Sequence, residues 1–192
     1  MLTIHLDDVT DINGQFILGN QQFSGEYITS KDIKINDSNL QFVFDSIVYK
    51  INTVPRNKIF LKLTDNYLEK FNFLINKIQS DINIETDDHD TVFYGKSNYL
   101  TPRLPGGTVN EEHVIYTKIY KVINKKAVRI DIIDIPNQFK GLFTVKLRSV
   151  GSSNLTERPN FLILEITEIL ITEIINNTVN NNPSSFKYLN YL

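Results

Sequence analysis

The sequence contains no cysteine and no tryptophan, and it has a single methionine and a single alanine, Ala127. Without cysteine there is no disulfide framework, no thiol nucleophile and no cysteine metal site, which is compatible with a reducing compartment. The first eight residues have neither a basic start nor an apolar core, so we expect no signal peptide. No apolar run reaches the length of a membrane-spanning helix, and we expect no membrane partner.

Catalytic motifs are also missing. There is no G-x-S-x-G, no Walker A and no G-x-G-x-x-G, and the chain has only three histidines. The acidic run Asp87 to Asp90, which includes His89, has oxygen and imidazole ligands for a hard cation or zinc. However, neighbouring residues of an extended loop point in different directions, and no second ligand motif matches this one. We therefore predict no enzyme, no metal site and no cofactor; a nuclease using these aspartates would need divalent ions.

Net charge is −2, but the charges are segregated along the chain. The segment from 46 to 64 and the segment from 113 to 130 are basic and contain no carboxylate, whereas acids gather at 81 to 90 and near the end. The second basic segment carries five cations, Lys118, Lys121, Lys125, Lys126 and Arg129. A segregated distribution favours a polyanionic partner more than the net charge does.

Most of the chain reads as β-strand, and its 192 residues are enough for one domain. In the run from 142 to 149, Phe143, Val145 and Leu147 share one face and Thr144, Lys146 and Arg148 share the other. The runs 58–63 and 113–123 alternate in the same way, and the run 41–51 is a longer strand candidate with a bulge expected near Asp45-Ser46. Residues 161–171 are aliphatic and β-branched, which favours a strand covered on both sides over the alternative of a helix.

One amphipathic helix is predicted from Asp65 to Ser80, capped by Thr64 or Asp65, with an apolar stripe beginning at Tyr67. Asn13-Gly14 predicts a hairpin between residues 9–12 and 16–18, and further turns are expected at 19–20 and 37–39. The composition changes at Asn176 to Asn, Pro and Ser. We therefore expect one domain over residues 1–175 and a flexible, aromatic tail over 176–192.

Rings and cations alternate on the presumed outer strand faces. The patterns are Lys58-x-Phe60-x-Lys62 and Tyr116-x-Lys118-x-Tyr120, with a looser set of Tyr94, Lys96, Tyr99 and Arg103. Residues i and i+2 of a strand point the same way, so base stacking and phosphate neutralisation can share one face. The alternative is that the rings are core residues and the lysines are solvated edges.

The stretch from 58 to 172 resembles the single-stranded DNA-binding proteins of large DNA viruses and their relatives. The points of similarity are the strand 58–63, a Tyr-then-Pro segment ending in Leu104-Pro105, a Lys140-Gly141 turn opening a strand, and the closing aliphatic strand. The resemblance implies an OB-type barrel that coats displaced strands during replication, inside a host cell or in a virion. Many such proteins end in an acidic tail, whereas this chain ends in an aromatic one, which is a candidate for self-association.

We therefore predict a mainly β (α+β) protein, an OB-like or Greek-key barrel or sandwich with one amphipathic helix and a flexible C-terminal tail. The predicted function is sequence-independent binding of single-stranded DNA; the alternative is a structural β-sandwich of a virion or assembly. The predicted base-stacking residues are Phe60, Tyr99, Tyr116 and Tyr120. The predicted phosphate contacts are Lys58, Lys62, Arg103, Lys118, Arg129, Lys146 and Arg148.

Overall fold

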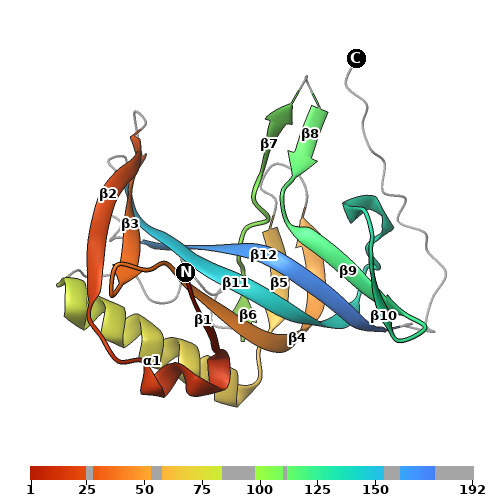
Figure 1. Ribbon diagram of the computed structural model, residues 1–192, viewed down its shortest axis with the longest axis horizontal. Helices are drawn as coiled ribbons and strands as arrows, with labels where there is room; N and C mark the ends of the chain where they lie inside the picture. The colour runs from red at the N-terminus through yellow and green to blue at the C-terminus, as the bar shows by residue number, and fades with distance from the viewer. Residues whose placement is uncertain (25–27, 53–57, 84–97, 110–111, 154–160, 176–192) are drawn as a thin grey trace.

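A strongly curved sheet with one α-helix against part of its inner face makes up the computed structural model (Figure 1). The structure describes residues 1–24, 28–52, 58–83, 98–109, 112–153 and 161–175. The elements are β1 (Leu2–His5), η1 (Leu6–Asp11), β2 (Phe16–Ser24), β3 (Ile28–Ile35), β4 (Leu40–Asn52), β5 (Lys58–Lys62), α1 (Asp65–Ile82), β6 (Tyr99–Leu100), β7 (Gly106–Val109), β8 (Glu112–Ile115), β9 (Lys118–Ile123), β10 (Lys126–Arg129), η2 (Ile132–Asp134), β11 (Phe139–Ser153) and β12 (Phe161–Ile174).

Alternation along the long central strands separates an inner from an outer face. On β11 the predicted face of Phe143, Val145 and Leu147 is buried, and the residues between them are only half-buried. β4 pairs antiparallel with β11 and places Phe44 opposite Phe143, so both strands bury the same face. A side chain opposite a buried one points inward, and its neighbours along the strand point outward.

Helix α1 covers the inner face of β4. Phe71 makes edge-to-face contacts with Phe42 and Phe44 at ring-centroid distances of 6.0 and 5.6 Å. Tyr67 contacts the same Phe44 ring at 5.8 Å. Such aromatic pairs add about 0.5–1.5 kcal/mol each beyond their area burial. The predicted helix is confirmed and extends two residues beyond Ser80.

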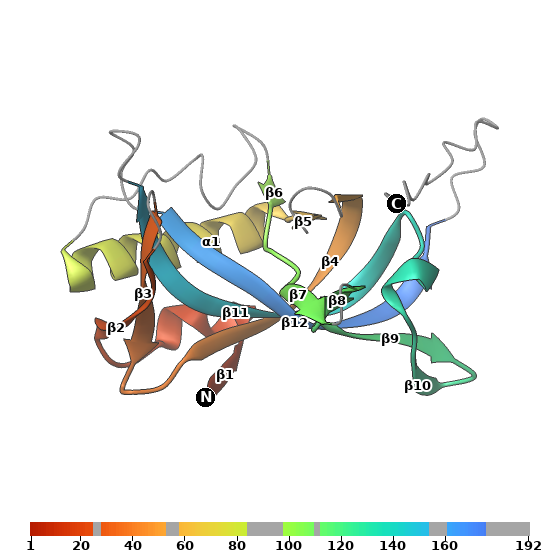
Figure 2. The same cartoon turned by 90° about the horizontal axis from the view of Figure 1, so that it is seen from above.

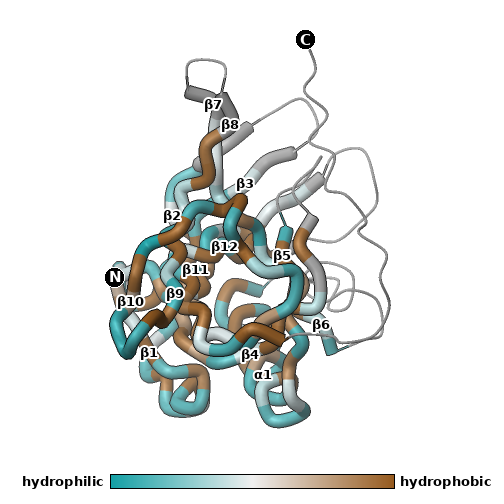
Figure 3. The backbone as a smooth tube through the Cα atoms, turned by 90° about the vertical axis from the view of Figure 1, so that its right-hand side faces the viewer, coloured by the Kyte–Doolittle hydropathy of each residue, from teal (hydrophilic) through white to brown (hydrophobic). Residues whose placement is uncertain are grey.

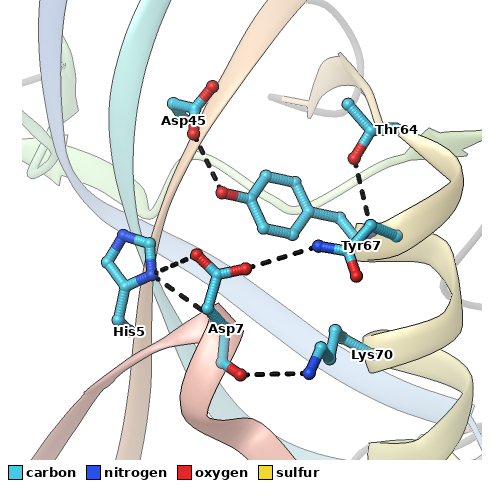
Figure 4. A network of polar contacts seen from close by, with 7 residues as sticks. His5, Asp7, Asp45, Thr64, Tyr67 and Lys70 are labelled. Carbon is cyan, nitrogen blue, oxygen red and sulfur yellow. Dashed lines mark hydrogen bonds and ion pairs between the residues drawn. The ribbon is translucent and has the colours of Figure 1, made fainter.

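Two hydrogen bonds fix the start of α1 (Figure 4). The Thr64 hydroxyl accepts from the backbone N–H of Tyr67 at 3.3 Å, as predicted for an N-cap. The Tyr67 hydroxyl donates to Asp45 on β4 at 2.9 Å. Burial, and after it the hydrogen bond to Asp45, raise the pKa of Tyr67 to about 12. The phenol is therefore held neutral.

Helix α1 is also tied to the first residues of the chain, by the same network. Lys70 Nζ donates to the backbone carbonyl of Asp7 at 3.1 Å, and the Asn66 amide donates to the Asp7 carboxylate at 3.4 Å. His5 Nδ1 lies 3.0 Å from the same carboxylate. These contacts hold η1 against the first turns of α1.

At its other end, α1 is fixed to β2 through Asp81. The Asp81 carboxylate accepts from the backbone N–H of Phe16 at 2.9 Å and lies 3.1 Å from Lys77 Nζ. Partial burial acts to raise the pKa of Asp81, but the bond from Phe16 and the Lys77 ammonium outweigh it and lower that pKa. The contribution of Asp81 to stability is therefore present above its ordinary pKa of 3.8 and is lost as the pH falls through the lowered value.

The main strand path runs β10-β9-β12-β11-β4-β5-β6 and is open. One residue links its β5 side back to β12. Arg103 forms single bridges with Lys58 of β5 and with Glu165 of β12. Its backbone N–H donates to Leu164 and its carbonyl accepts from Ile166, both at 2.9 Å. Between β12, β11, β4, β5 and this segment the sheet thus curls into a barrel-like turn.

The predicted class, mainly β with one amphipathic helix in an OB-like arrangement, is confirmed. The predicted strand over 161–171 is β12. Among the described helices none is long and apolar enough to cross a bilayer. The predicted tail, 176–192, lies outside the described residues, so its flexibility stays a prediction.

Three local predictions are wrong. Residues 9–12 lie in and just after η1 rather than in a hairpin strand, because Leu6 and Val9, three apart, are both buried on one side of a 3-10 turn. Gly19-Asn20 is no turn but part of β2, where a register shift absorbs it. The run 113–123 is two strands, β8 and β9, broken at Tyr116-Thr117.

Replacing Tyr67 with Phe tests the neutral phenol. The pKa of Tyr67 is about 12 in the folded state against an ordinary value of 10.0, so the neutral phenol stabilises the fold. This stabilisation is fully present below pH 10 and is lost as the pH rises through 12. Wild-type unfolding free energy should therefore fall by roughly 1–3 kcal/mol more across this window than that of Tyr67→Phe. Urea titrations at several alkaline pH values measure this, with Tyr49→Phe as the exposed-tyrosine control. Equal slopes for wild type and Tyr67→Phe would contradict it.

Candidate nucleic-acid interface

The outer face of the sheet carries most of the predicted side chains. Lys62 lies opposite Ile47 and Tyr99, Lys146 lies opposite Gln41 and Glu165, and Lys118 lies opposite Glu168. All of these positions alternate with buried residues on their strands. Lys58, Phe60, Tyr120 and Arg148 occupy outer positions by the same alternation.

Four predicted cations gather where Arg103 joins β5 to β12. Arg103 forms isolated β-bridges with Lys58 on one side and with Glu165 on the other. Glu165 in turn lies opposite Lys146 in the β11–β12 pair. Directly opposed residues of neighbouring strands have Cβ atoms about 4.5–5.5 Å apart, so these side chains are immediate neighbours. Arg148 completes the group, because its guanidinium lies 3.3 Å from Glu165. We call Lys58, Arg103, Lys146 and Arg148 the basic cluster; its first and last members are 90 residues apart in the sequence.

Within the basic cluster, Arg148 forms an ion pair with Glu165. The side chain of Glu165 is 19% exposed, and that of Arg148 is 41% exposed. A partly exposed ion pair of this kind is worth about 1 kcal/mol or less. Its exchange for a phosphate oxygen therefore costs little.

An aromatic pair of one exposed and one half-buried ring lies at the other end of β5. The rings of Tyr49 and Tyr99 are 5.0 Å apart between centroids and inclined at 45°. Tyr49 is 56% exposed, and Lys62 lies directly opposite Tyr99. Tyr49 is absent from the predicted residues. It follows Val48 at a register shift in β4, and the Gln41-to-Ile51 alternation alone could have placed it on the outer face.

The prediction that Phe60 stands open on the outer face is wrong. Its side chain is only 8% exposed, although it does not belong to the main hydrophobic core formed by Ile59, Leu61 and their neighbours. Phe60 therefore points to the outer side of β5 but is covered there. Phe60 therefore offers no open ring, whereas Tyr49 is an accessible ring beside β5.

The remaining predicted residues lie around β9 and β10, apart from the basic cluster. Lys118 and Arg129 are exposed, and Tyr120, opposite Arg129, is half-buried. Glu168 faces Lys118 across the β9–β12 pair. The predicted residues thus form two groups, one along β5 and β12 and one on β9 and β10, rather than one continuous surface.

Tyr116 belongs to neither group. It is 58% exposed at the break between β8 and β9, and its hydroxyl lies 2.6 Å from where a side-chain Cβ on Gly107 would stand. Gly107 therefore permits the close approach of this tyrosine to the base of the β7–β8 hairpin. The alternation that places Lys118 outward and Thr117 and Ile119 inward is confirmed by the burial of the last two.

The metal hypothesis falls outside the described residues. Asp87 to Asp90, like Tyr94 and Lys96 of the looser aromatic set, are not among them. Within the part of the chain that the structure describes, no three His, Asp or Glu residues come together as metal ligands would.

Comparison with known proteins finds a structural likeness only. No protein-family model matches the sequence, and no curated protein matches it. The crystal structure of gp2.5, a single-stranded DNA-binding protein encoded by bacteriophage T7, is similar with a TM-score of 0.44 and 11% sequence identity, over 76% of this chain and 92% of that chain. A likeness of this extent does not assign a function.

Two carboxylates of the chain should differ in what they contribute to stability. Asp81→Asn should lower the unfolding free energy by roughly 1.5–3 kcal/mol, because the charged acceptor of the Phe16 N–H is lost. Glu165→Gln should change it by about 1 kcal/mol or less, because the pair with Arg148 is partly exposed. Urea denaturation at neutral pH followed by circular dichroism compares them. A larger loss for Glu165→Gln would mean that Glu165 is a structural ion-pair residue rather than a surface one.

Proposed function

We propose that this chain binds single-stranded DNA without sequence preference, as a coat for strands exposed in replication or recombination. The observation that supports this best is the outer side of β5 and its neighbours. The Tyr49–Tyr99 pair lies beside Lys62 at one end, and the basic cluster lies at the other. Rings that stack bases and cations that neutralise phosphates are the two elements of single-strand binding.

The basic cluster supplies the phosphate contacts. Arg103 and Arg148 carry planar guanidinium groups, which bind phosphate oxygens through two parallel hydrogen bonds. Lys58 and Lys146 act as flexible point charges beside them. A phosphate at this position would take over the role that Glu165 has toward Arg148, at 3.3 Å in the free protein. Binding would thus replace one charge-assisted contact by a similar one and release counterions from the strand.

β5 is about as long as a short stretch of extended single-stranded DNA. Lys58 and Lys62 mark its two ends, and at about 3.3 Å per residue they lie roughly 13 Å apart. One end presents rings and the other presents the basic cluster. A DNA strand lying along β5 could therefore stack a base on Tyr49 or Tyr99 while its phosphates reach Arg103 and Arg148. Paired bases of a duplex offer no free face to those rings, which favours single strands over duplex.

Fluorescence anisotropy with a labelled oligothymidylate tests the proposed function. Binding should be tighter for the single strand than for a duplex of equal length. It should also weaken steeply with salt, by about 0.7 log units per phosphate contact for each decade of salt. Light scattering on the free protein serves as the companion measurement, because large symmetric assemblies would favour a structural role. Affinity that barely responds to salt, or that is equal for the duplex, would overturn the proposal.

Tyr49→Ala tests the aromatic pair. Loss of one stacking ring should cost about 1–3 kcal/mol, which corresponds to about 5- to 150-fold weaker binding to oligothymidylate. The salt dependence should stay unchanged, because no cation is lost. Tyr49→Phe keeps the ring and should bind like wild type. Phe73→Ala, which removes an exposed ring from α1, is the matched control. Equal losses for Tyr49→Ala and Phe73→Ala would remove the pair from the site.

A further inference from the structure

The β9–β10 hairpin leaves the rest of the molecule. β9 pairs with β12 only between Lys118 and Lys121, whereas it pairs with β10 from Tyr120 to Ile123. All four residues of β10 are exposed. Figures 1 and 2 show the hairpin at the end of the molecule opposite α1. It is a two-stranded ribbon supported by the sheet at its base alone.

The turn of this ribbon places a lysine at its tip. Asn124 and Lys125 have φ angles of 49° and 63°, the left-handed pair that a two-residue type I′ turn requires. Lys126 follows directly and lies opposite Ile123. The geometry therefore holds two adjacent lysines at the end of the ribbon.

The charge of the ribbon is not compensated within it. From 118 to 129 the chain has five cations and no carboxylate. Lys77, Lys140 and Arg148 each have an ion-pair partner, whereas none of the five ribbon cations forms an ion pair with any described residue. The nearby acids belong to neighbouring elements: Glu168 opposite Lys118, Glu173 of β12, which pairs with Lys140, and Asp131 and Asp134 at η2.

The ribbon also exposes apolar side chains between its cations. Val122, Ile123 and Val128 are each 41–43% exposed, and the hydropathy colours alternate along the hairpin in Figure 3. Cross-strand pairs such as Lys121 with Val128 place a cation and an aliphatic group side by side. A polyanion that also offers apolar surface, such as the sugar and base faces of a nucleic acid, matches this pattern better than a simple counterion does.

We propose that the β9–β10 hairpin is a second nucleic-acid contact, which extends the site beyond the outer face of β5 by binding the phosphate backbone through Lys121, Lys125 and Lys126. This inference rests on the proposed function. It implies that a short single strand fills the β5 region alone, whereas a longer one also reaches the ribbon. The three lysines then contribute to affinity only above a certain strand length.

The test compares two oligothymidylates, of about 8 and about 30 nucleotides, within and above the range of about 4–16 that one OB-type domain covers. Lys121→Gln/Lys125→Gln/Lys126→Gln should bind the long strand at least tenfold more weakly. Its salt slope there should fall by about 2, from three lost phosphate contacts at about 0.7 each. Binding of the short strand should stay within about twofold of wild type. The triple Lys→Arg variant should restore wild-type binding to the long strand.

The matched control, Lys31→Gln/Lys34→Gln/Lys70→Gln, makes the same change in net charge on β3 and α1. Equal weakening by this control would overturn the inference, because net charge alone would explain the loss. Unchanged binding of the ribbon variant to the long strand, or equal loss for both strands with an unchanged melting temperature, would overturn it as well. If wild type binds neither strand, the proposed function itself fails, and that result is distinct from a variant-specific failure.

Discussion

Packing of Phe42 and Phe44 against Phe71 of α1 is the interaction on which the rest of the structure depends. It commits one face of β4 to the interior, and pairing of Phe44 with Phe143 commits the same face of β11. Since side chains alternate along a strand, every residue between these positions is turned outward. Packing of the core thus decides which side chains lie on the outer face. The cations there need no interactions of their own to be placed on that face.

The cations of the sheet lie in two different environments. On β11 and β12, which are central strands, Lys140 and Arg148 each face a glutamate of the neighbouring strand. A cation between paired strands is partly removed from water, so a nearby carboxylate offsets part of its desolvation. On β10 all side chains are in water, where like charges a few ångströms apart repel by only about 1 kcal/mol and salt screens them. Uncompensated lysines are therefore tolerated on the ribbon.

Much of the fold follows from patterns of two and of 3.6 residues. The period of two over 142–149 predicts which side of β11 is buried, and the apolar stripe from Tyr67 predicts α1 and its Thr64 cap. Local periodicity fails where tertiary contacts decide. Phe60 alternates as an outer residue and does point outward, but it is covered there. Whether an outward ring is open depends on what packs over it, which no local pattern contains.

The site was less predictable than the fold for a similar reason. Alternation predicts that Lys58, Lys146 and Arg148 are outward, and Arg103 belongs to the looser aromatic set. Their meeting depends on Arg103 bridging β5 and β12. That contact joins Lys58 to Glu165 across more than half of the chain. Bridges of this kind are set by the curvature of the whole sheet, so the sequence pattern indicates these four cations one by one without indicating that they meet.

Curvature also explains why the two basic regions are separate. The edge of β12 is shared: Arg103 occupies it at Glu165, and β9 occupies it from Glu168 onward. The chain leaves this edge after Arg103, forms the β7–β8 hairpin, and returns to it at Lys118. A DNA strand lying along β12 would therefore meet the basic cluster first and the β9–β10 hairpin second, with Glu168 between them. This order along one edge is what would allow a short ligand to occupy the first region without reaching the second.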